Sequence, residues 1–393
     1  MSAALDILRW IAAILCVMSL IGVALTVALG LIAPAIHARR ARRTDLPPIS
    51  FVLPIKDWAP GFKPSQGSVF ELDYPEFDVT ATAAESESRA VSAMRSVIEA
   101  YPGHEARIVR STASFAVSPK VNNLFQAIED AKYDLIATKD SNIVLPPQTA
   151  RAAIAAMTED VGLVTAITEA KGARNPAAMI EASLMNQSHA RILHAAAAIW
   201  LGFGLGKLMI FKRSDLHRAG GFDAIAHTVG EDSATAHALA SIGLRTVIIG
   251  APIYQMLGVR RFADVYHRQM RWAVIRRQNE LPGFLVEPLG LSVFAALAAA
   301  IAAPLVGWPA AAAALATLLF WFACETALAF ARGWDVSVSA PAVMVARDAM
   351  MTSVWLRAWF TKRVVWAAEV YDAQQERGAA PAADAPDEKR NDA

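Results

Sequence analysis

Two apolar runs frame this chain and enclose a long stretch in which apolar and polar residues alternate. Residues 11–36 are almost wholly apolar, more than the ~20 residues that a helix needs to cross a bilayer. A second apolar block, residues 289–330, is interrupted at 304–309 by two prolines and a glycine and predicts two helices of about 20 residues each. The pattern therefore predicts a membrane protein with one N-terminal span and two or more C-terminal spans.

Basic residues predict the orientation of these spans. Arg39, Arg40, Arg42 and Arg43 follow the first apolar run, where a signal peptide would instead have a small-residue cleavage site. Positively charged residues flank the cytoplasmic ends of membrane helices. We expect an uncleaved anchor, a multi-pass membrane protein, and a polar region on the cytoplasmic side.

The C-terminal end of the chain allows two interpretations. Residues 340–366 are apolar but include Arg347, Asp348 and Arg357. They form either a third C-terminal span with a buried charge pair or helices at the membrane interface, and the charges favour the interface. Residues 373–393 are rich in Ala, Pro, Asp and Glu, a composition typical of a disordered tail.

Strands and helices alternate between the apolar runs. Such alternation predicts an α/β domain with a mostly parallel sheet, in which ligands bind at the carboxyl ends of the strands. The expected strands are 49–55, 77–82, 106–110, 133–138, 162–167, 207–212 and 245–249, and the expected helices are 85–100, 176–198, 231–241 and two that start near 118 and 146. The expected domains are an anchor with a basic linker (1–46), the α/β domain (47–285), a membrane region (286–372) and the tail (373–393).

Composition and net charge indicate which kinds of partner the protein can bind. Apolar residues make up 55% of the chain and the formal net charge is +1. A chain of this kind is suited to a membrane, and it lacks the basic excess with which proteins bind nucleic acid. We therefore expect no nucleic-acid partner.

A candidate metal site follows one of the predicted strands. Asp140 and Asn142 stand two residues apart just after strand 133–138. Two oxygen ligands at a strand end can hold a hard divalent cation, Mg²⁺ or Mn²⁺, which offsets charge on a diphosphate. Without the neighbouring motifs, a turn or helix cap would be the favoured interpretation of Asp140.

The acidic pair Glu231-Asp232 opens a predicted helix. A carboxylate in that position usually caps free backbone N–H groups. The functional interpretation makes Asp232 the general base that takes a proton from an acceptor hydroxyl. Spacing alone does not decide which member of the pair faces the site.

Arg268-Gln-Met-Arg271-Trp272 lies in a basic stretch just ahead of the second apolar block. Residues three apart share one face of a helix, so the two guanidinium groups can grip a diphosphate together, with the indole beside them. The flanking Arg260, Arg261, Arg276 and Arg277 are better suited to anionic lipid headgroups.

Two further charged residues are candidates for function. Lys120 follows Ser118-Pro119 at the predicted start of a helix, where backbone N–H groups attract anions, although an ordinary surface helix is the simpler interpretation. Glu325 lies inside a predicted span, a position that marks a functional residue by default.

The chain resembles the ceramide glucosyltransferase family and is also similar to bacterial hopanoid-associated glycosyltransferases. The resemblance covers about residues 49–288. The matching stretches are Phe70-Glu-Leu-Asp-Tyr-Pro75, Pro119-Lys-Val-Asn-Asn-Leu124, Lys132-Tyr-Asp-Leu-Ile136, Asp140-Ser, Gly220-Gly-Phe222, Glu231-Asp232 and Arg268-Gln-Met-Arg-Trp272.

The resemblance implies a GT-A fold and an inverting membrane enzyme that transfers glucose from UDP-glucose to ceramide. It implies Asp232 as the base and Lys120, Asp140, Arg268, Arg271 and Trp272 as donor-binding residues. The family's aspartate that contacts the nucleotide base aligns with Glu85, which is one methylene longer.

Three alternatives remain open from the sequence. The same chemistry can act on another donor sugar or on another lipid, such as a hopanoid polyol or diacylglycerol. A processive polysaccharide synthase shares the acidic and Arg-Trp motifs, but it needs more spans and usually has glutamine where Arg268 stands. A degenerate, sugar-nucleotide-binding membrane protein is the third alternative, and the replacement at Glu85 is its main support.

Overall fold

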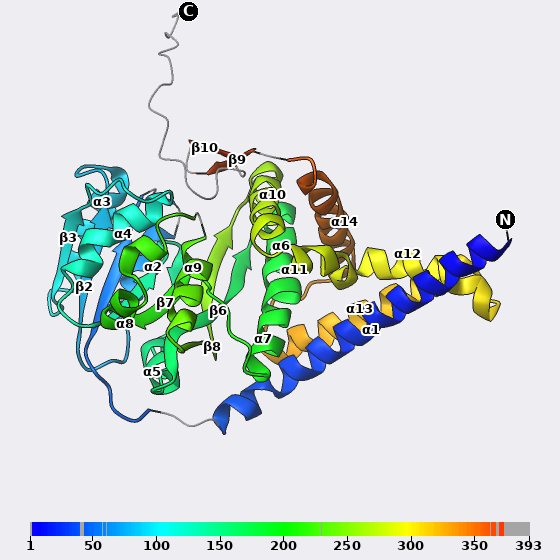
Figure 1. Cartoon of the computed structure of the whole chain (residues 1–393), viewed down its shortest axis with the longest axis horizontal. Helices are drawn as coiled ribbons and strands as arrows, with labels where there is room; N and C mark the ends of the chain where they lie inside the picture. Colours follow the sequence, from blue (N-terminus) through cyan, green and yellow to red (C-terminus); the bar gives the residue numbers. More distant parts are fainter. Residues whose placement is uncertain are drawn as a thin grey trace, which may run out of the picture.

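A computed structural model describes residues 2–39, 43–56, 58–59, 61–228, 230–361, 363–366 and 369–372. The predicted tail at 373–393, together with Arg40 and Arg42, lies outside the described residues. Figure 1 shows a sheet domain covered by helices, from which α1 and α13 extend side by side. The strands are β1 (Ile49–Pro54), β2 (Phe77–Ala83), β3 (Ala106–Arg110), β4 (Leu135–Lys139), β5 (Ile143–Val144), β6 (Val161–Ala173), β7 (Leu208–Lys212), β8 (Arg245–Gly258), β9 (Arg363–Trp366) and β10 (Glu369–Asp372).

The central sheet is mixed. Its eight strands run in the order β3-β2-β1-β4-β7-β6-β8-β5. The pairs within β3-β2-β1-β4 are parallel, as predicted, and Ile49 of β1 lies opposite Phe77 of β2. Strand β7 is antiparallel to both of its neighbours, which the sequence did not indicate. Beyond it, β6 and β8 are again parallel.

Helices cover both faces of the sheet. Strand β1 explains why, because Phe51 and Leu53 enter the apolar core on one face while Val52 enters the core on the other. Side chains that alternate in this way require an apolar layer on each side. The helices of this domain are α2 (Phe62–Gly67), α3 (Arg89–Ala100), α4 (Pro119–Glu129), α5 (Thr149–Ala156), α6 (Pro176–Ser183), α7 (Arg191–Ala198), α8 (Arg213–Arg218), α9 (Glu231–Ser241) and α10 (Phe262–Asn279).

The predicted long helix 176–198 is interrupted by a π-helix. Its segments are α6, the π-helix η1 (Leu184–Ala190) and α7. A π-helical turn inserts an extra residue and is common near functional sites. Here it changes which side chains of the helix face α10 on one side and the membrane helices on the other.

Two described helices are long and apolar enough to cross a membrane. These are α1 (Ser2–Ala38), over its residues Ala3–His37, and α13 (Ala310–Arg332). The first of the two predicted C-terminal spans is not one straight helix. It consists of α11 (Leu281–Val286) with a 3₁₀ turn and α12 (Ser292–Ala302) with another, and the two halves bend by 69°.

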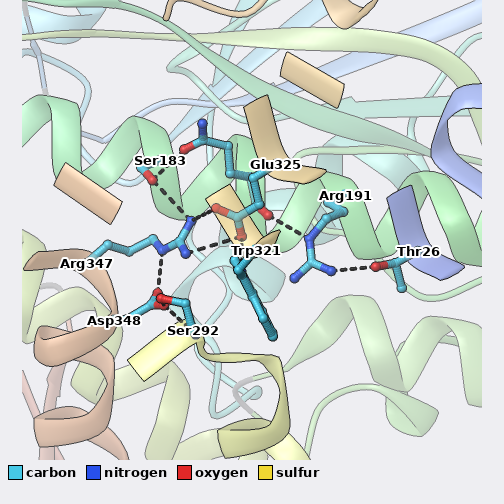
Figure 2. Close-up of polar contacts among 9 residues, drawn as sticks. Thr26, Ser183, Arg191, Ser292, Trp321, Glu325, Arg347 and Asp348 are labelled. Atoms are coloured by element: carbon cyan, nitrogen blue, oxygen red, sulfur yellow. Dashed lines mark hydrogen bonds and ion pairs between the residues drawn. The ribbon is translucent and has the colours of Figure 1, made fainter. Parts of the chain in front are cut away.

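In the C-terminal helix α14 (Ala340–Ala358), Arg347 and Asp348 are buried, as the third-span alternative expected, but α14 is not among the described helices that are apolar enough to cross a membrane. Arg347 Nε lies 2.6 Å from Asp348 Oδ1, and the Arg347 guanidinium also binds Glu325 at 3.0 Å (Figure 2). Glu325 in turn accepts a 2.9 Å hydrogen bond from Trp321 Nε1. Glu325, which had no partner predicted from the sequence, therefore serves to join α13 to α14.

Candidate active site

Four charged side chains converge at the carboxyl end of β4. Asp140 follows the last residue of that strand, where an α/β sheet binds ligands. Lys120, from the first turn of α4, places Nζ 2.7 Å from Asp140 Oδ1 and 2.9 Å from Glu231 Oε1. Lys207, just before β7, lies 3.3 Å from Asp140 Oδ2. The structure thus brings Lys120 and Asp140 together with the acidic pair, although Glu231 follows Asp140 by 91 positions in the sequence.

The two members of the acidic pair point in different directions. Glu231 is buried and faces Lys120. Asp232 is half-buried, and its Oδ2 accepts a 2.9 Å hydrogen bond from the backbone N–H of Gly206. Its Oδ1 accepts another from the N–H of Ser233 at 2.9 Å. The two hydrogen bonds fix the Asp232 carboxylate in the first turn of α9, which is capped by Gly230.

Burial and charge set the protonation of this cluster. Burial alone would raise the pKa of Asp140, but Lys120 and Lys207 outweigh it and lower the pKa to about 2. The pKa of Glu231 is raised, because burial and the neighbouring Asp232 outweigh the attraction of Lys120. The pKa of Lys120 is raised despite burial, because Asp140 and Glu231 lie against it. At neutral pH, Lys120 and Asp140 are therefore both charged.

A glycine-rich segment closes one side of the cluster. Residues 202–206 read Gly-Phe-Gly-Leu-Gly and run in front of α9 and β8. A Cβ atom at Gly204 would lie 2.0 Å from the carbonyl oxygen of Asp232. The carbonyl of Gly206 accepts a 2.8 Å hydrogen bond from Lys120. Because Gly204 and Gly206 have no side chains, the backbone of this segment can lie against Asp232.

Glu85 and Asn142 lie at the same edge of the sheet but at the surface. Glu85 is exposed in the loop after β2, and Asn142 is exposed in the turn between β4 and β5. Glu87, the other glutamate of this loop, forms a 2.6 Å ion pair with Arg95. Glu85 is thus the better placed of the two glutamates to reach a ligand from this loop.

The Arg268-Gln-Met-Arg-Trp272 motif lies on α10, as predicted, and packs against α6 and η1. Arg268 forms an ion pair with Glu181, a buried residue of α6. Trp272 lies against His189 of η1, with ring centroids 6.2 Å apart. Burial, helped by nearby arginines, lowers the pKa of His189 to about 4, so its imidazole is neutral. Arg271 is half-buried beside this pair, and burial lowers the pKa of its guanidinium.

The flanking arginines have partners within the protein. Arg260 Nε lies 3.2 Å from Glu181, and Arg276 Nε lies 2.5 Å from Glu287. Arg277 donates a 2.8 Å hydrogen bond to the Trp359 carbonyl. The expectation that these three side chains serve lipid headgroups is therefore corrected: they hold α10 to α6, to the 3₁₀ turn after α11 and to the end of α14.

The side chains at Asp140 fit a metal ion that receives most of its ligands from the substrate and from water. Among the described residues, no three His, Cys, Asp or Glu side chains are grouped to hold a metal ion. Mg²⁺ commonly binds through one or two carboxylates and completes its shell with phosphate oxygens and water. Asp140, ionised and partly exposed, supplies one such carboxylate, and the exposed Asn142 amide is two residues away.

Sequence reasoning missed Lys207, Glu181 and the 202–206 segment. Glu181 and Lys207 have no motif around them, and their roles come from tertiary contacts. The three glycines at alternate positions were a signal, because glycine at such spacing marks a close approach of one backbone to another.

Comparison with known proteins agrees with this architecture. A mannosyltransferase from Pyrobaculum calidifontis, solved in complex with GDP-Man and Mn²⁺, superposes with a TM-score of 0.52 at 19% identity, covering 90% of this chain and 99% of that one. The likeness shows that the fold is GT-A, as predicted.

Curated relatives match this chain over part of its length. Ceramide glucosyltransferases 1 and 3 of Caenorhabditis elegans are 27% and 24% identical over 256 residues, 65% of this chain. This chain matches 55% and 56% of their lengths, so it spans little more than half of each. The ceramide glucosyltransferase of Komagataella phaffii is 29% identical over 99 residues, which is 24% of this chain and 19% of that protein.

The family model for glycosyl transferase family 21 matches residues 11–379, which include both apolar regions and the whole sheet domain. The match contains every site residue described above, and the ceramide glucosyltransferase resemblance seen in the motifs is confirmed. This chain belongs to glycosyl transferase family 21.

Proposed function

We propose that this enzyme transfers glucose from UDP-glucose to the hydroxyl of ceramide, with inversion at the anomeric carbon. One observation carries the proposal: Lys120, Asp140, Glu231 and Asp232 converge at the carboxyl edge of the sheet. The names of the curated relatives support ceramide and glucose, and α1 and α13 give the enzyme access to a membrane-bound lipid.

The donor binds at Asp140. A divalent cation held there by Asp140 and Asn142 would offset the charge of the diphosphate. The solved mannosyltransferase, which contains GDP-Man and Mn²⁺, supports such a cation. Lys120 and Lys207 present ammonium groups to the same space and attract phosphate oxygens. Glu85 contacts the nucleotide base from the loop after β2. Arg268, Arg271 and Trp272 complete the donor site from α10.

The acceptor hydroxyl approaches Asp232. Asp232 removes its proton, the hydroxyl oxygen forms a bond to the anomeric carbon, and the bond from that carbon to the diphosphate breaks. UDP leaves with the bonding electrons. Attack on the side opposite to the leaving group inverts the configuration. The N–H groups of Gly206 and Ser233 hold the carboxylate in place before the transfer.

The catalytic domain faces the cytoplasm in this proposal. Arg39 and Arg43 follow α1 and Arg332 ends α13, so basic residues flank the ends of both candidate spans nearest the sheet domain. That distribution matches the excess of Lys and Arg on cytoplasmic segments. UDP-sugars made in the cytosol would reach the site directly.

The test uses the full chain reconstituted in phosphatidylcholine vesicles. UDP-glucose, UDP-galactose or UDP-N-acetylglucosamine is supplied with ceramide, diacylglycerol or a hopanoid polyol, and products are identified by mass and by the NMR coupling of the anomeric proton. We expect glucosylceramide with β configuration from UDP-α-glucose. A glycolipid from another pair would reassign the donor or the acceptor, and no product from any pair would refute the enzyme.

A further inference from the structure

The segment 199–206, between α7 and β7, has two unlike sides. Its sequence, Ile-Trp-Leu-Gly-Phe-Gly-Leu-Gly, places bulky apolar residues first and alternates them with glycine towards the end. Ile199, Trp200, Leu201 and Phe203 are each between 42% and 58% exposed. Exposed apolar residues that are contiguous in this way indicate an interaction surface rather than ordinary surface scatter.

The glycine side of the segment is fixed against the catalytic residue. A Cβ at Gly202 would lie 2.0 Å from the Thr246 carbonyl, and one at Gly204 would lie equally close to the Asp232 carbonyl. The Phe203 carbonyl accepts a 3.0 Å hydrogen bond from Thr165 Oγ1. Because no side chain fits on this side, the apolar side chains project away from the sheet.

The apolar side continues the surface of α1. Helix α7, which leads into the segment, packs along the C-terminal part of α1, and Arg191 hydrogen-bonds Thr26 (Figures 1 and 2). Exposed apolar side chains cover both helices in this region, at Ile192 on α7 and at Leu31 and Ile32 on α1. The surface of a candidate membrane span therefore extends through α7 to Trp200.

We infer that residues 199–203 insert into the surface of the bilayer and that the lipid acceptor passes along this segment to Asp232. This inference rests on the proposed function, because it assigns the lipid's entry path to the same active site. Phe203, the last of the inserted residues, and Gly206, whose N–H binds the Asp232 carboxylate, are three residues apart, so at most about 11 Å of backbone separates the apolar surface from the base. To cover that distance, the headgroup of the lipid and the first carbons of its chains must rise out of the bilayer along the segment.

Two features of Trp200 fit an interfacial anchor. It adopts φ +68°, a backbone conformation that is rare for a bulky residue, and its side chain is exposed. The Arg245 guanidinium lies 5.3 Å from its ring. Tryptophan with a neighbouring cation is typical of the boundary between headgroups and acyl chains.

The first test measures insertion without using activity. The protein is reconstituted in vesicles of phosphatidylcholine with and without brominated acyl chains, which quench nearby indoles. Trp200→Phe and Trp58→Phe are compared with the unchanged chain, because Trp58 lies under Arg89 in the loop after β1. The fluorescence that each variant lacks is the contribution of the replaced tryptophan. We expect brominated lipid to quench the contribution of Trp200 and to leave that of Trp58 unquenched. Equal quenching of the two contributions would overturn the inference.

The second test measures delivery of the lipid. The double variant Trp200→Ser/Leu201→Ser is compared with Phe115→Ser, an exposed apolar residue in the loop before α4. We expect the double variant to raise KM for long-chain acceptor in vesicles on the order of tenfold, since lipid binding scales with buried apolar area. Its kcat, its KM for a short-chain soluble acceptor and its thermal midpoint should match those of Phe115→Ser.

The outcomes separate the two proposals. An unchanged KM for long-chain acceptor, with normal turnover, refutes the entry path and leaves the enzyme proposal standing. A loss with both acceptors that follows a lowered thermal midpoint also refutes the path, because the segment would then be structural. If the unchanged chain forms no glycolipid with any acceptor, the proposed function fails, and the bromine test still decides whether the segment inserts.

Discussion

Replacing Lys120 by methionine should destabilise the protein through the carboxylates that it leaves behind. Its ammonium lies 2.7 Å from Asp140 and 2.9 Å from Glu231, and the three side chains are 15%, 26% and 9% exposed. Removing one partner of a buried ion pair costs about 3–5 kcal/mol. Since Asp140 keeps Lys207 at 3.3 Å and some solvent, we expect the lower end, about 3 kcal/mol.

The stability lost in Lys120→Met should depend on pH. The pKa of Asp140 is lowered from 3.8 to about 2, which stabilises the folded state by about 2 kcal/mol above pH 4 and is lost as the pH falls towards 2. Without Lys120, the stabilisation that comes from the lowered pKa of Asp140 becomes smaller. The pKa of Glu231, already raised, should rise further, so the folded variant takes up a proton that the unfolded chain releases. The variant therefore recovers as the pH falls, and the difference from wild type is largest near neutral pH.

Thermal unfolding in detergent micelles measures both effects. A domain of this size shifts by about 2–4 °C per kcal/mol, so the midpoint should fall by roughly 6–12 °C at neutral pH and by clearly less at about pH 5. Lys132→Met is the matched control, because its 2.6 Å ion pair with Glu105 is exposed and is worth only about 0–1 kcal/mol. The reasoning fails if both variants shift equally, or if the Lys120→Met shift is the same at both pH values.

Three further predictions follow from the described contacts. Asp232→Asn should lower kcat by about 10²–10⁴-fold with donor binding retained. The control is Asp73→Asn, which changes an exposed partner of Arg151 and should leave kcat unchanged. Full activity of Asp232→Asn would exclude Asp232 as the base. Gly204→Ala should displace the start of α9 and abolish turnover, because its Cβ would lie 2.0 Å from a carbonyl oxygen, while Gly103→Ala meets open space and should be neutral in the same assay. Arg347→Met should lower the free energy of unfolding by about 3–5 kcal/mol, because Glu325 and Asp348 lose their shared cation. A thermal unfolding midpoint close to that of wild type would show that this network is not needed for the packing of α13 on α14.

Local pattern was sufficient for much of the sheet. Strand β3 and helix α9 have the bounds that the sequence predicted, because turn residues bracket each of them. Strands β6 and β8 continue well past the predicted ends, to Ala173 and Gly258. Their pairing shifts register between Ala166 and Thr168. A bulge breaks the alternation of side chains without ending the strand, so periodicity alone stops too early.

Side-chain partners were harder to predict than positions. Asp140, Lys120 and the acidic pair could be named from their places at element ends, yet nothing local shows that one ammonium binds two carboxylates. Arg268 and Arg271 share a face of α10, as spacing requires. Arg268 nevertheless forms an ion pair with Glu181, because α6 supplies a buried carboxylate at that place. An isolated buried carboxylate is costly, so it captures the nearest guanidinium.

The division of labour between Glu231 and Asp232 follows from the charges around them. Asp140, Glu231 and Asp232 carry three carboxyl groups near two ammonium groups, and Lys120 is shared between the first two. Glu231 is buried and bound to Lys120, which suits it to hold that ammonium in place. Asp232 is bound by backbone N–H groups that supply no competing charge, and the 199–206 segment contacts it. A base must meet its acceptor, and Asp232 is the less buried of the two carboxylates and is held by backbone groups rather than by an ammonium, which is why the proposed role of base falls to it.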